Sequence, residues 1–312
     1  MTPLTIQILS HNNENLLKTI ESLLPLNAYI TIINIGCLQK KYDFVEKYDI
    51  KIKEVDKKLE RSKIRNDFIQ ADKNEWMMYI EPGEVISSGH ENILEAIKEE
   101  HTSRRLFVVR DDLIIKETRL WKKSSNKFVY PVYETLSPDT NPKICNAFIS
   151  GSIEETDNLD ILVKWKEREP QNPQPDYYLA IQHLVNKKYQ DYLKYANLYF
   201  FREKEKSQSL ITLHYYHALV ELHHSRNVHE CIRHITFCLT EKPLMAEYWC
   251  VLGDALYKTG MVEQAQEMFY NAIVLGQERE TDDDFPVELS KYKDYPEKMI
   301  NLCGAIRGNN DR

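Results

Sequence analysis

Strand and helix patterns alternate along roughly the first 110 residues, and this alternation limits the folds open to the chain. Apolar runs rich in β-branched residues predict strands, and apolar residues every three or four positions predict the helices between them. The strands are expected at 4–9, 29–35, 50–55, 76–80 and 106–109, and the helices at 16–24, 42–47, 61–71 and 92–100. Such alternation is typical of an α/β domain built on a mostly parallel sheet.

Three prolines between residues 168 and 175 mark the clearest linker in the chain. Each proline lacks a backbone donor and restricts the residue before it. We therefore expect an N-terminal domain at 1–165, a proline-rich linker at 166–176 and a C-terminal domain at 177–312. Short β segments are predicted before the linker, around 113–115, 118–121 and 128–132, and after it the pattern is wholly helical.

The C-terminal part contains an internal repeat with a period of about 34 residues, which is the period of the tetratricopeptide repeat. Large residues recur where one helix packs on the next, and small residues recur where helix backbones approach closely. One copy comprises Trp249, Leu252, Gly253, Leu256, Gly260, Ala265, Phe269 and Ala272, and the copy before it comprises Tyr215, Ala218, Leu219, Leu222, Cys231, Ile235 and Cys238. A looser copy begins near Tyr178. The repeats predict a short solenoid of helical hairpins, capped by the C-terminal segment.

The apolar run Trp76–Ile80 is followed at once by Glu81-Pro82-Gly83-Glu84. Such a run fits a strand buried on both faces of a parallel sheet, and Pro-Gly fits the turn where the chain leaves it. In open α/β sheets, ligands bind outside the carboxyl ends of the strands. Glu81 and Glu84 therefore have two open interpretations. They are either oxygen ligands for a divalent cation on a phosphate-bearing ligand, or solvated carboxylates of a surface turn.

Composition argues against several classes of partner and location. The 312 residues carry a net charge of −7 without a long run of Lys or Arg, which argues against nucleic acid or an anionic membrane as the main partner. No apolar run approaches the ~20 residues that span a bilayer, and no signal peptide is visible. Six cysteines without CxxC spacing are expected to be reduced thiols. Together these features predict a cytoplasmic protein.

Histidines gather in one predicted helical hairpin of the C-terminal part. They are His214, His217, His223, His224, His229 and His234. Their spacing lacks the HExxH arrangement of a zinc site, and the repeat already explains the helices. A solvated or interface helix face is therefore favoured over a metal site.

Several short motifs, taken in order, resemble those of the family-2 glycosyltransferases, which have the GT-A fold. Asn13-Glu14 resembles the loop after the family's first strand, and Ile32 to Cys37 resembles its motif V-V-D-x-G-S. Further along, Arg65-Asn66 resembles A-R-N, and Trp76 to Glu84 stands where the family has an apolar strand followed by D-A-D-E. Arg119 to Trp121 resembles R-L-F, and Tyr133-Glu134 stands where related enzymes carry H-E. Tyr177 to Ala180 is similar to the start of the repeat domain in members that continue into tetratricopeptide repeats. The resemblance implies a GT-A-like, Rossmann-like domain followed by an all-α tetratricopeptide-repeat domain.

The resemblance also implies roles for particular residues. Asn13, Glu14, Asn34, Arg65 and Glu81 would contact the nucleotide sugar, Glu81 and Glu84 would hold a divalent cation (Mn²⁺ or Mg²⁺), and Glu134 would be the catalytic base. Several of these residues also have a plainer alternative. Asn13 and Asn34 would cap loops. Arg65 would pair with an acidic neighbour, and Glu134 would be an ordinary surface residue.

Three positions depart from the family pattern. Asn34 occupies a position where the family has Asp, and Gly83 occupies the position of the second Asp of the D-x-D motif. Tyr133 occupies a position where related enzymes have His. The D-x-D motif is thus degenerate, and a cation would lose one protein oxygen ligand. Cation binding could then be weak, dispensable or lost.

Two functions remain open. The family implies a nucleotide-sugar-dependent glycosyltransferase, inverting and with a UDP-linked donor. Its acceptor would be a peptide or protein presented with help of the repeat domain, which could instead form a homodimer. The three altered positions motivate the alternative, which is a catalytically inactive, glycosyltransferase-like scaffold that binds protein partners through its repeats. The transferase is the first hypothesis.

Overall fold

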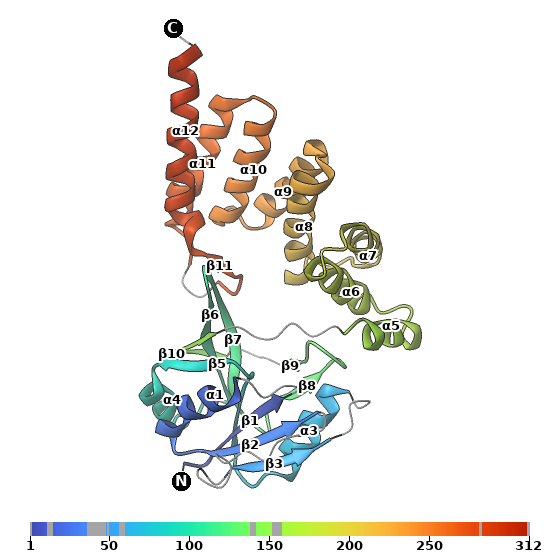
Figure 1. Cartoon of the computed structure of the whole chain (residues 1–312), viewed down its shortest axis with the longest axis vertical. Coiled ribbons are helices and arrows are strands. Elements are labelled where there is room, and N and C mark those ends of the chain that lie inside the picture. The colour runs from blue at the N-terminus through green and yellow to red at the C-terminus, as the bar shows by residue number, and fades with distance from the viewer. Residues whose placement is uncertain are drawn as a thin grey trace. The chain divides into compact units, whose positions relative to one another are not determined.

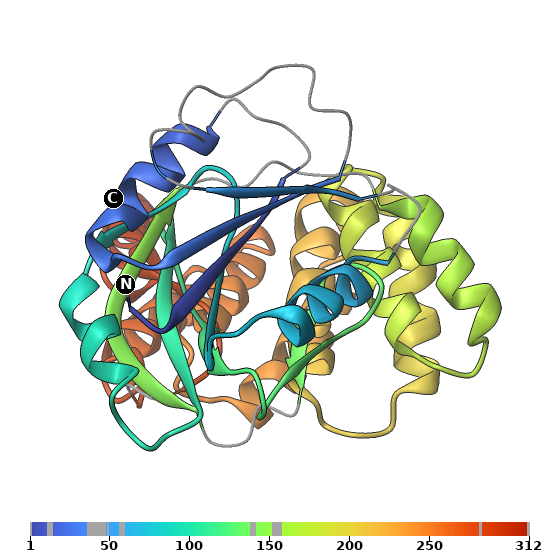
Figure 2. The same ribbon diagram turned by 90° about the horizontal axis from the view of Figure 1, so that it is seen from below.

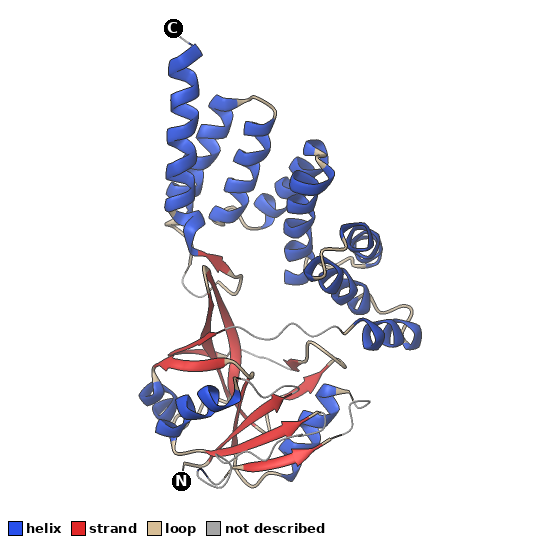
Figure 3. Cartoon of the chain, in the orientation of Figure 1, coloured by secondary structure: helices blue, strands red, loops and turns tan. Residues whose placement is uncertain are grey.

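The computed structural model describes residues 2–10, 15–35, 48, 50–55, 60–137, 142–151, 158–280 and 283–310. The chain forms two compact units, Met1–Asp157 and Asn158–Arg312. Strands concentrate in the first unit and helices in the second (Figure 1, Figure 3). In the described ranges, no helix is both long and apolar enough to cross a membrane.

The first unit is built on a sheet with the strand order β3-β2-β1-β4-β7-β6-β10-β5. In one half, β1 (Leu4–Ser10), β2 (Tyr29–Asn34), β3 (Lys51–Glu54) and β4 (Trp76–Ile80) run parallel to one another. The other half contains β7 (Leu113–Lys122), β6 (Ser103–Arg110), β10 (Lys143–Gly151) and β5 (Glu84–Ser88). There β6 and β10 pair in parallel, whereas β4 with β7, β7 with β6, and β10 with β5 are antiparallel. The predicted α/β unit with a mostly parallel sheet is confirmed.

The mixed half of the sheet differs most from the sequence prediction. β5 and β10 were not predicted, because β5 runs from a glutamate to two serines and most side chains of β10 are at least partly exposed. The segments predicted at 113–115 and 118–121 join into the single strand β7. The segment predicted around 128–132 corresponds to β8 (Lys127–Val129), which pairs with β9 (Thr135–Ser137) in a separate sheet. The helix predicted at 42–47 lies outside the described residues.

Helices cover both faces of the parallel half, because successive side chains of a strand point to opposite faces. On β1, Ile6 and Ile8 pack with α1 (Leu16–Leu23) and α4 (His90–Ala96). Leu9 points the other way and packs with Ile64 of α3 (Arg61–Ala71). Figure 2 shows α1 and α4 on one side of these strands and α3 on the opposite side. With both faces covered, every residue of β1 is buried.

The second unit consists of antiparallel helices. After α5 (Leu159–Arg168) come three hairpins: α6 (Gln174–Val185) with α7 (Tyr189–Arg202), α8 (Gln208–Val220) with α9 (Val228–Glu241), and α10 (Ala246–Lys258) with α11 (Val262–Gly276). A π-helical turn, η2 (Glu221–Ser225), extends α8. A short strand β11 (Val287–Glu288) and a 3-10 turn η3 (Leu289–Tyr292) precede α12 (Asp294–Asn310). Most repeat positions are buried or half-buried, whereas Gly260 is exposed. The ring of Phe269 would lie 2.8 Å from a Cβ added at Gly253.

The structure differs from the predicted linker at 166–176, because the division between the units falls earlier and α5 belongs to the helical unit. Asp176 of α6 is fully buried and bonds Lys166 of α5 and Arg202 of α7, the latter at 2.5 Å. We call these three residues the Asp176 ion cluster. Pro173 and Pro175 stand at the start of α6. Backbone N–H groups there have no carbonyl partner within the helix, so a proline loses no helical hydrogen bond. The prolines therefore begin a helix instead of marking a free linker.

The histidines of the second unit divide into two groups. His223, His224 and His229 are exposed, whereas His217 and His234 are 3% and 1% exposed at the interface of α8 and α9. His214 joins the buried pair, with its Nδ1 lying 2.6 Å from Nδ1 of His234. Arg233 donates to Nε2 of His234 at 2.9 Å, so His234 must carry its proton on Nδ1 and donate it to His214. Within the described residues, no group of three or more ligating side chains could hold a metal ion.

Candidate functional site

The carboxyl ends of the parallel strands meet at one edge of the sheet, where the sequence predicted a ligand. Ser10 of β1 pairs with Asn34 of β2, and Asn34 pairs with Glu54 of β3. β4 ends beside them and leads directly into Glu81. Asn34 is 3% exposed, so its side chain is buried at this edge. The predicted nucleotide contacts Asn13 and Glu14 lie outside the described residues.

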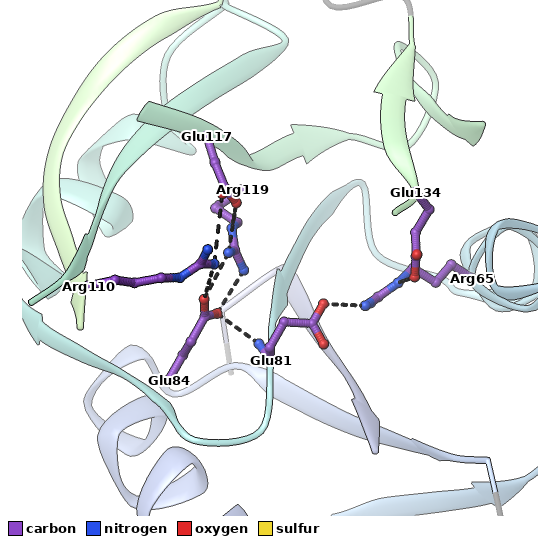
Figure 4. Close-up of polar contacts among 7 residues, drawn as sticks. All are labelled: Arg65, Glu81, Glu84, Arg110, Glu117, Arg119 and Glu134. Atoms are coloured by element: carbon purple, nitrogen blue, oxygen red, sulfur yellow. Dashed lines mark hydrogen bonds and ion pairs between the residues drawn. The ribbon is translucent and has the colours of Figure 1, made fainter. Parts of the chain in front are cut away.

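Arg65 joins two of the predicted site carboxylates. Projecting from α3, it donates from Nη2 to Oε1 of Glu81 at 2.6 Å and from Nε to Oε1 of Glu134 at 2.9 Å (Figure 4). The side chains of Arg65 and Glu134 are 1% and 8% exposed. Arg65 thus pairs with acidic neighbours, which the sequence left open as its plainer alternative, and Glu134 is not an ordinary surface residue.

Aromatic rings and one unused nitrogen complete the surroundings of Arg65. The rings of Tyr79 and Phe128 lie 5.0 and 5.2 Å from its guanidinium carbon. Burial by itself lowers the pKa of Arg65, but Glu81 and Glu134 raise it above its ordinary value. Its Nη1 is buried and has no hydrogen-bond partner within the described residues. Leaving a buried N–H without a partner costs about 1–3 kcal/mol. A hydrogen bond from Nη1 to an acceptor oxygen of a ligand would remove this cost.

Glu84 lies in a second ion cluster, on the other side of Glu81 (Figure 4). Its two oxygens accept from Nη1 and Nη2 of Arg119 at 2.8 and 2.9 Å, and Oε1 also accepts from Arg110 at 3.2 Å. The backbone N–H of Glu81 donates to Oε2 at 2.9 Å, and Glu117 bonds Arg119 from its other side at 2.8 Å. Burial by itself raises the pKa of Glu84, but Arg119 and these further donors hold it below its ordinary value.

The two predicted cation ligands differ in their fitness for that role. A carboxylate offers about four acceptor positions, and those of Glu84 are occupied by three guanidinium N–H groups and one backbone N–H. A cation there would also face two arginines, so Glu84 does not fit as a metal ligand. Glu81 fits better, because its side chain is 24% exposed and only Oε1 is bonded within the described residues. Burial raises the pKa of Glu81, and Arg65 opposes this shift.

Sequence reasoning gave no role to four further residues that lie at the site. They are Arg119, described above, and Arg110, Glu117 and Tyr79. Arg110 and Glu117, each 27% exposed, lie beside Glu84 and Arg119. Tyr79 of β4 lies between the clusters, with the guanidinium carbon of Arg119 4.3 Å from its ring and that of Arg65 5.0 Å from it. Glu117 and Arg119 stand two apart on one strand and so share a face, but the opposing partner Glu84 could not be inferred without knowing the sheet order.

Comparison with known proteins finds distant structural likenesses. No protein-family model matches the sequence, and no curated protein matches it. Among solved structures, residues 1–349 of TarS from S. aureus are 12% identical with a TM-score of 0.39, covering 96% of this chain and 90% of that one. MamA from Desulfovibrio magneticus RS-1, from residue 41 to its end, is 15% identical with a TM-score of 0.36, covering 49% of this chain and 86% of that one. At these identities and TM-scores the likenesses assign no function to the chain.

Proposed function

We propose that the first unit binds a nucleotide sugar, UDP-linked, at the carboxyl edge of its sheet and transfers the sugar, with inversion, to an acceptor. One observation carries this proposal. Arg65, Glu81 and Glu134 come from three separate parts of the chain, and they converge at 2.6 and 2.9 Å beside the end of the central parallel strand. The acceptor is a peptide or protein presented with help of the helical unit, because helical solenoids commonly bind extended peptides or protein surfaces.

The charge at this edge favours a divalent cation on the nucleotide. Arg65, Arg110 and Arg119 are outnumbered by the carboxylates of Glu81, Glu84, Glu117 and Glu134 (Figure 4). A diphosphate adds further negative charge, so it needs a cation that these arginines do not supply. Mg²⁺ commonly binds through one or two carboxylates plus substrate phosphates. Glu81 is the carboxylate that would hold Mn²⁺ or Mg²⁺, and the ion would stabilise the charge of the leaving diphosphate.

Arg65 and Glu134 would have the remaining roles, which are phosphate binding and removal of the acceptor proton. Arg65 holds Glu81 and Glu134 at fixed positions by charge-assisted bonds, and its unbonded Nη1 is available to a phosphate oxygen. Glu134 is bonded through Oε1 alone within the described residues, so Oε2 is available to take the proton of the acceptor. Glu134→Gln would keep donor binding and lose turnover if this assignment is right.

We expect the cation to bind weakly without the nucleotide, and the nucleotide to bind weakly without the cation, because Glu81 offers the ion a single carboxylate. Melting temperature should change little with Mn²⁺ alone and rise with UDP-sugar and Mn²⁺ together. At a hundredfold excess over the dissociation constant, binding adds about 2.7 kcal/mol of stability, or roughly 5–10 °C for a unit of this size. Glu81→Gln should remove the cation-dependent part of that rise.

A matched control distinguishes this effect from a general loss of negative charge. Glu91 is exposed in the first turn of α4, and it is not part of the proposed site. Glu91→Gln should leave the combined shift as it is in the unmodified chain. An equal loss in both variants would mean that Glu81 is not the cation ligand, and no shift with any UDP- or GDP-sugar would contradict the transferase itself.

One observation favours the alternative of an inactive scaffold. The carboxylate of Glu84, which follows the degenerate D-x-D motif, is fully bonded by protein donors and does not fit a cation. A scaffold would bind protein partners without any effect of nucleotides on its melting temperature. Release of nucleotide from any sugar donor by the purified chain, lost in Glu134→Gln, would exclude it.

A further inference from the structure

A segment of the helical unit is held through its main chain by side chains of neighbouring helices. Residues 283–292 lie between α11 and α12 and contain β11 and η3. Gln208 of α8 donates to the carbonyl of Asp284 at 3.2 Å, and the thiol of Cys250 of α10 donates to the carbonyl of Lys291 at 3.6 Å. These contacts run across two different hairpins of the repeat.

Arg279 and Glu247 form hydrogen bonds with backbone atoms in the middle of the same segment. Arg279 donates from Nη2 to the carbonyl of Phe285 at 2.5 Å and from Nη1 to that of Pro286 at 3.4 Å. Glu247 of α10 accepts the backbone N–H of Glu288 at 2.8 Å. The side chains of Arg279 and Glu247 are only 7% and 3% exposed. Two buried charged groups are thus directed at backbone atoms of the segment.

Two side chains of the segment are recognised individually. Phe285 is 7% exposed and belongs to the core formed with Tyr215 of α8 and Tyr248 of α10, and Lys242 lies 5.0 Å from its ring. Tyr215 donates its hydroxyl to Oε1 of Glu288 at 2.7 Å. The surface therefore selects an aromatic residue and, three positions later, a carboxylate.

Such contacts are those by which a folded surface holds an extended peptide. Main-chain hydrogen bonds provide affinity that does not depend on sequence, and separate sites for side chains provide specificity. Helices that only pack on one another bury apolar faces and satisfy their backbone internally. Here Gln208, Glu247 and Arg279 instead bond the backbone of another segment.

We propose that α8, α10 and Arg279 form a peptide-binding surface that residues 283–292 occupy in cis. Its partner in trans is an extended peptide with an aromatic side chain followed three residues later by a carboxylate. The attached segment competes at an effective concentration in the millimolar range, so a partner binds only as far as the segment is released. This inference does not depend on the sugar transfer proposed for the first unit.

The test uses the full chain and a fluorescent synthetic peptide with the sequence of residues 283–292, Asp-Asp-Phe-Pro-Val-Glu-Leu-Ser-Lys-Tyr. Phe285→Ala weakens the attached segment without changing the surface. By fluorescence anisotropy, this variant should bind the peptide at least tenfold more tightly than the unmodified chain. A peptide with Ala in place of Phe should not bind. Adding Tyr215→Phe to the variant should weaken binding about tenfold, because a hydrogen bond to a carboxylate is lost.

Two results would overturn the proposal. One is a folded Phe285→Ala chain that binds the peptide no better than the unmodified chain. The other is a Phe285→Ala, Tyr215→Phe chain that binds as tightly as Phe285→Ala alone. If circular dichroism shows that Phe285→Ala does not fold, Glu288→Ala replaces it, because alanine has no acceptor for the hydroxyl of Tyr215. That variant loosens the segment at its bond to Tyr215 and leaves Phe285 in the core, and it must likewise bind the peptide more tightly than the unmodified chain does.

Discussion

Replacing Arg119 with methionine is expected to lower the free energy of unfolding by about 3–5 kcal/mol, because it leaves a buried carboxylate without its main partner. Arg119 and Glu84 are 1% and 0% exposed and share two hydrogen bonds of 2.8 and 2.9 Å. Arg110 would remain at 3.2 Å, but it bonds only one oxygen of Glu84. Urea denaturation, followed by tryptophan fluorescence, measures the change; Trp76 and Trp121 lie in the same sheet.

A second variant separates the cost of an orphaned charge from the value of the ion pair. Removing both partners in Arg119→Met, Glu84→Leu should restore most of the stability, since a buried ion pair can often be replaced by apolar residues. The matched surface control is Lys98→Met, which breaks the exposed pair with Glu95 and should cost less than about 1 kcal/mol. A double variant as unstable as the sum of its single variants would contradict this account of Glu84.

Acid is expected to destabilise the helical unit between pH 6.5 and 4 through its buried histidines. Burial lowers the pKa of His214 and of His217 to about 4, and burial together with both neighbours lowers that of His234 to about 2. Because these values lie below the ~6.5 of an unfolded histidine, the unfolded state binds more protons in this window. The stabilisation is therefore complete above pH 6.5 and is lost as the pH falls. If each histidine titrates independently, the free energy of unfolding falls by on the order of 3 kcal/mol per histidine between pH 6.5 and 4.

Charged neighbours add to the effect of burial, which is the main reason why the histidines at this interface resist protonation. Arg233 faces His234 at 2.9 Å, so a proton on that nitrogen would meet a guanidinium. Glu221 and Glu230 lie 3.6 and 3.7 Å from His217 and His234, too far for strong hydrogen bonds that would favour the charged form. The geometry thus holds all three rings neutral.

The pH dependence should be measured by circular dichroism in urea at pH 7.5, 6, 5 and 4.5. His234→Leu should flatten the loss of stability, because it removes the central ring of the cluster. His229→Gln changes an exposed histidine and should follow the unmodified chain. Equal slopes in the two variants would show that the acid sensitivity arises elsewhere, for example in the carboxylates.

The sequence located the parallel half of the sheet, and it singled out three residues that lie together in the structure, but it did not predict their contacts. The run Trp76–Ile80 is continuously apolar because both its faces are covered, and this signal is local. Arg65, Glu81 and Glu134 were also found from local motifs, whereas their mutual bonds depend on how α3 and the segment before β9 pack. Such packing is a tertiary property that no spacing in the sequence expresses.

The ion pairs of Glu84 were not predicted for a similar reason. In the sequence it follows Pro-Gly and so suggested a turn carboxylate open to solvent or metal. In the structure it is the first residue of β5, a strand without an apolar run, and Arg119 reaches it from β7. Only the pairing of β5 with β10 and the order of the sheet bring the two charges together.

The Asp176 ion cluster bears on where the chain can be cut to produce the helical unit by itself. A fragment starting at residue 177, as the prolines suggest, would lack both Asp176 and α5. Arg202 would lose its carboxylate, and Tyr178 would lose the ring of Trp165, 6.0 Å away, which is buried against it. A fragment starting at Asn158 keeps Lys166, Asp176 and Arg202 together. For expression of the separate helical unit, Asn158 is therefore the better first residue.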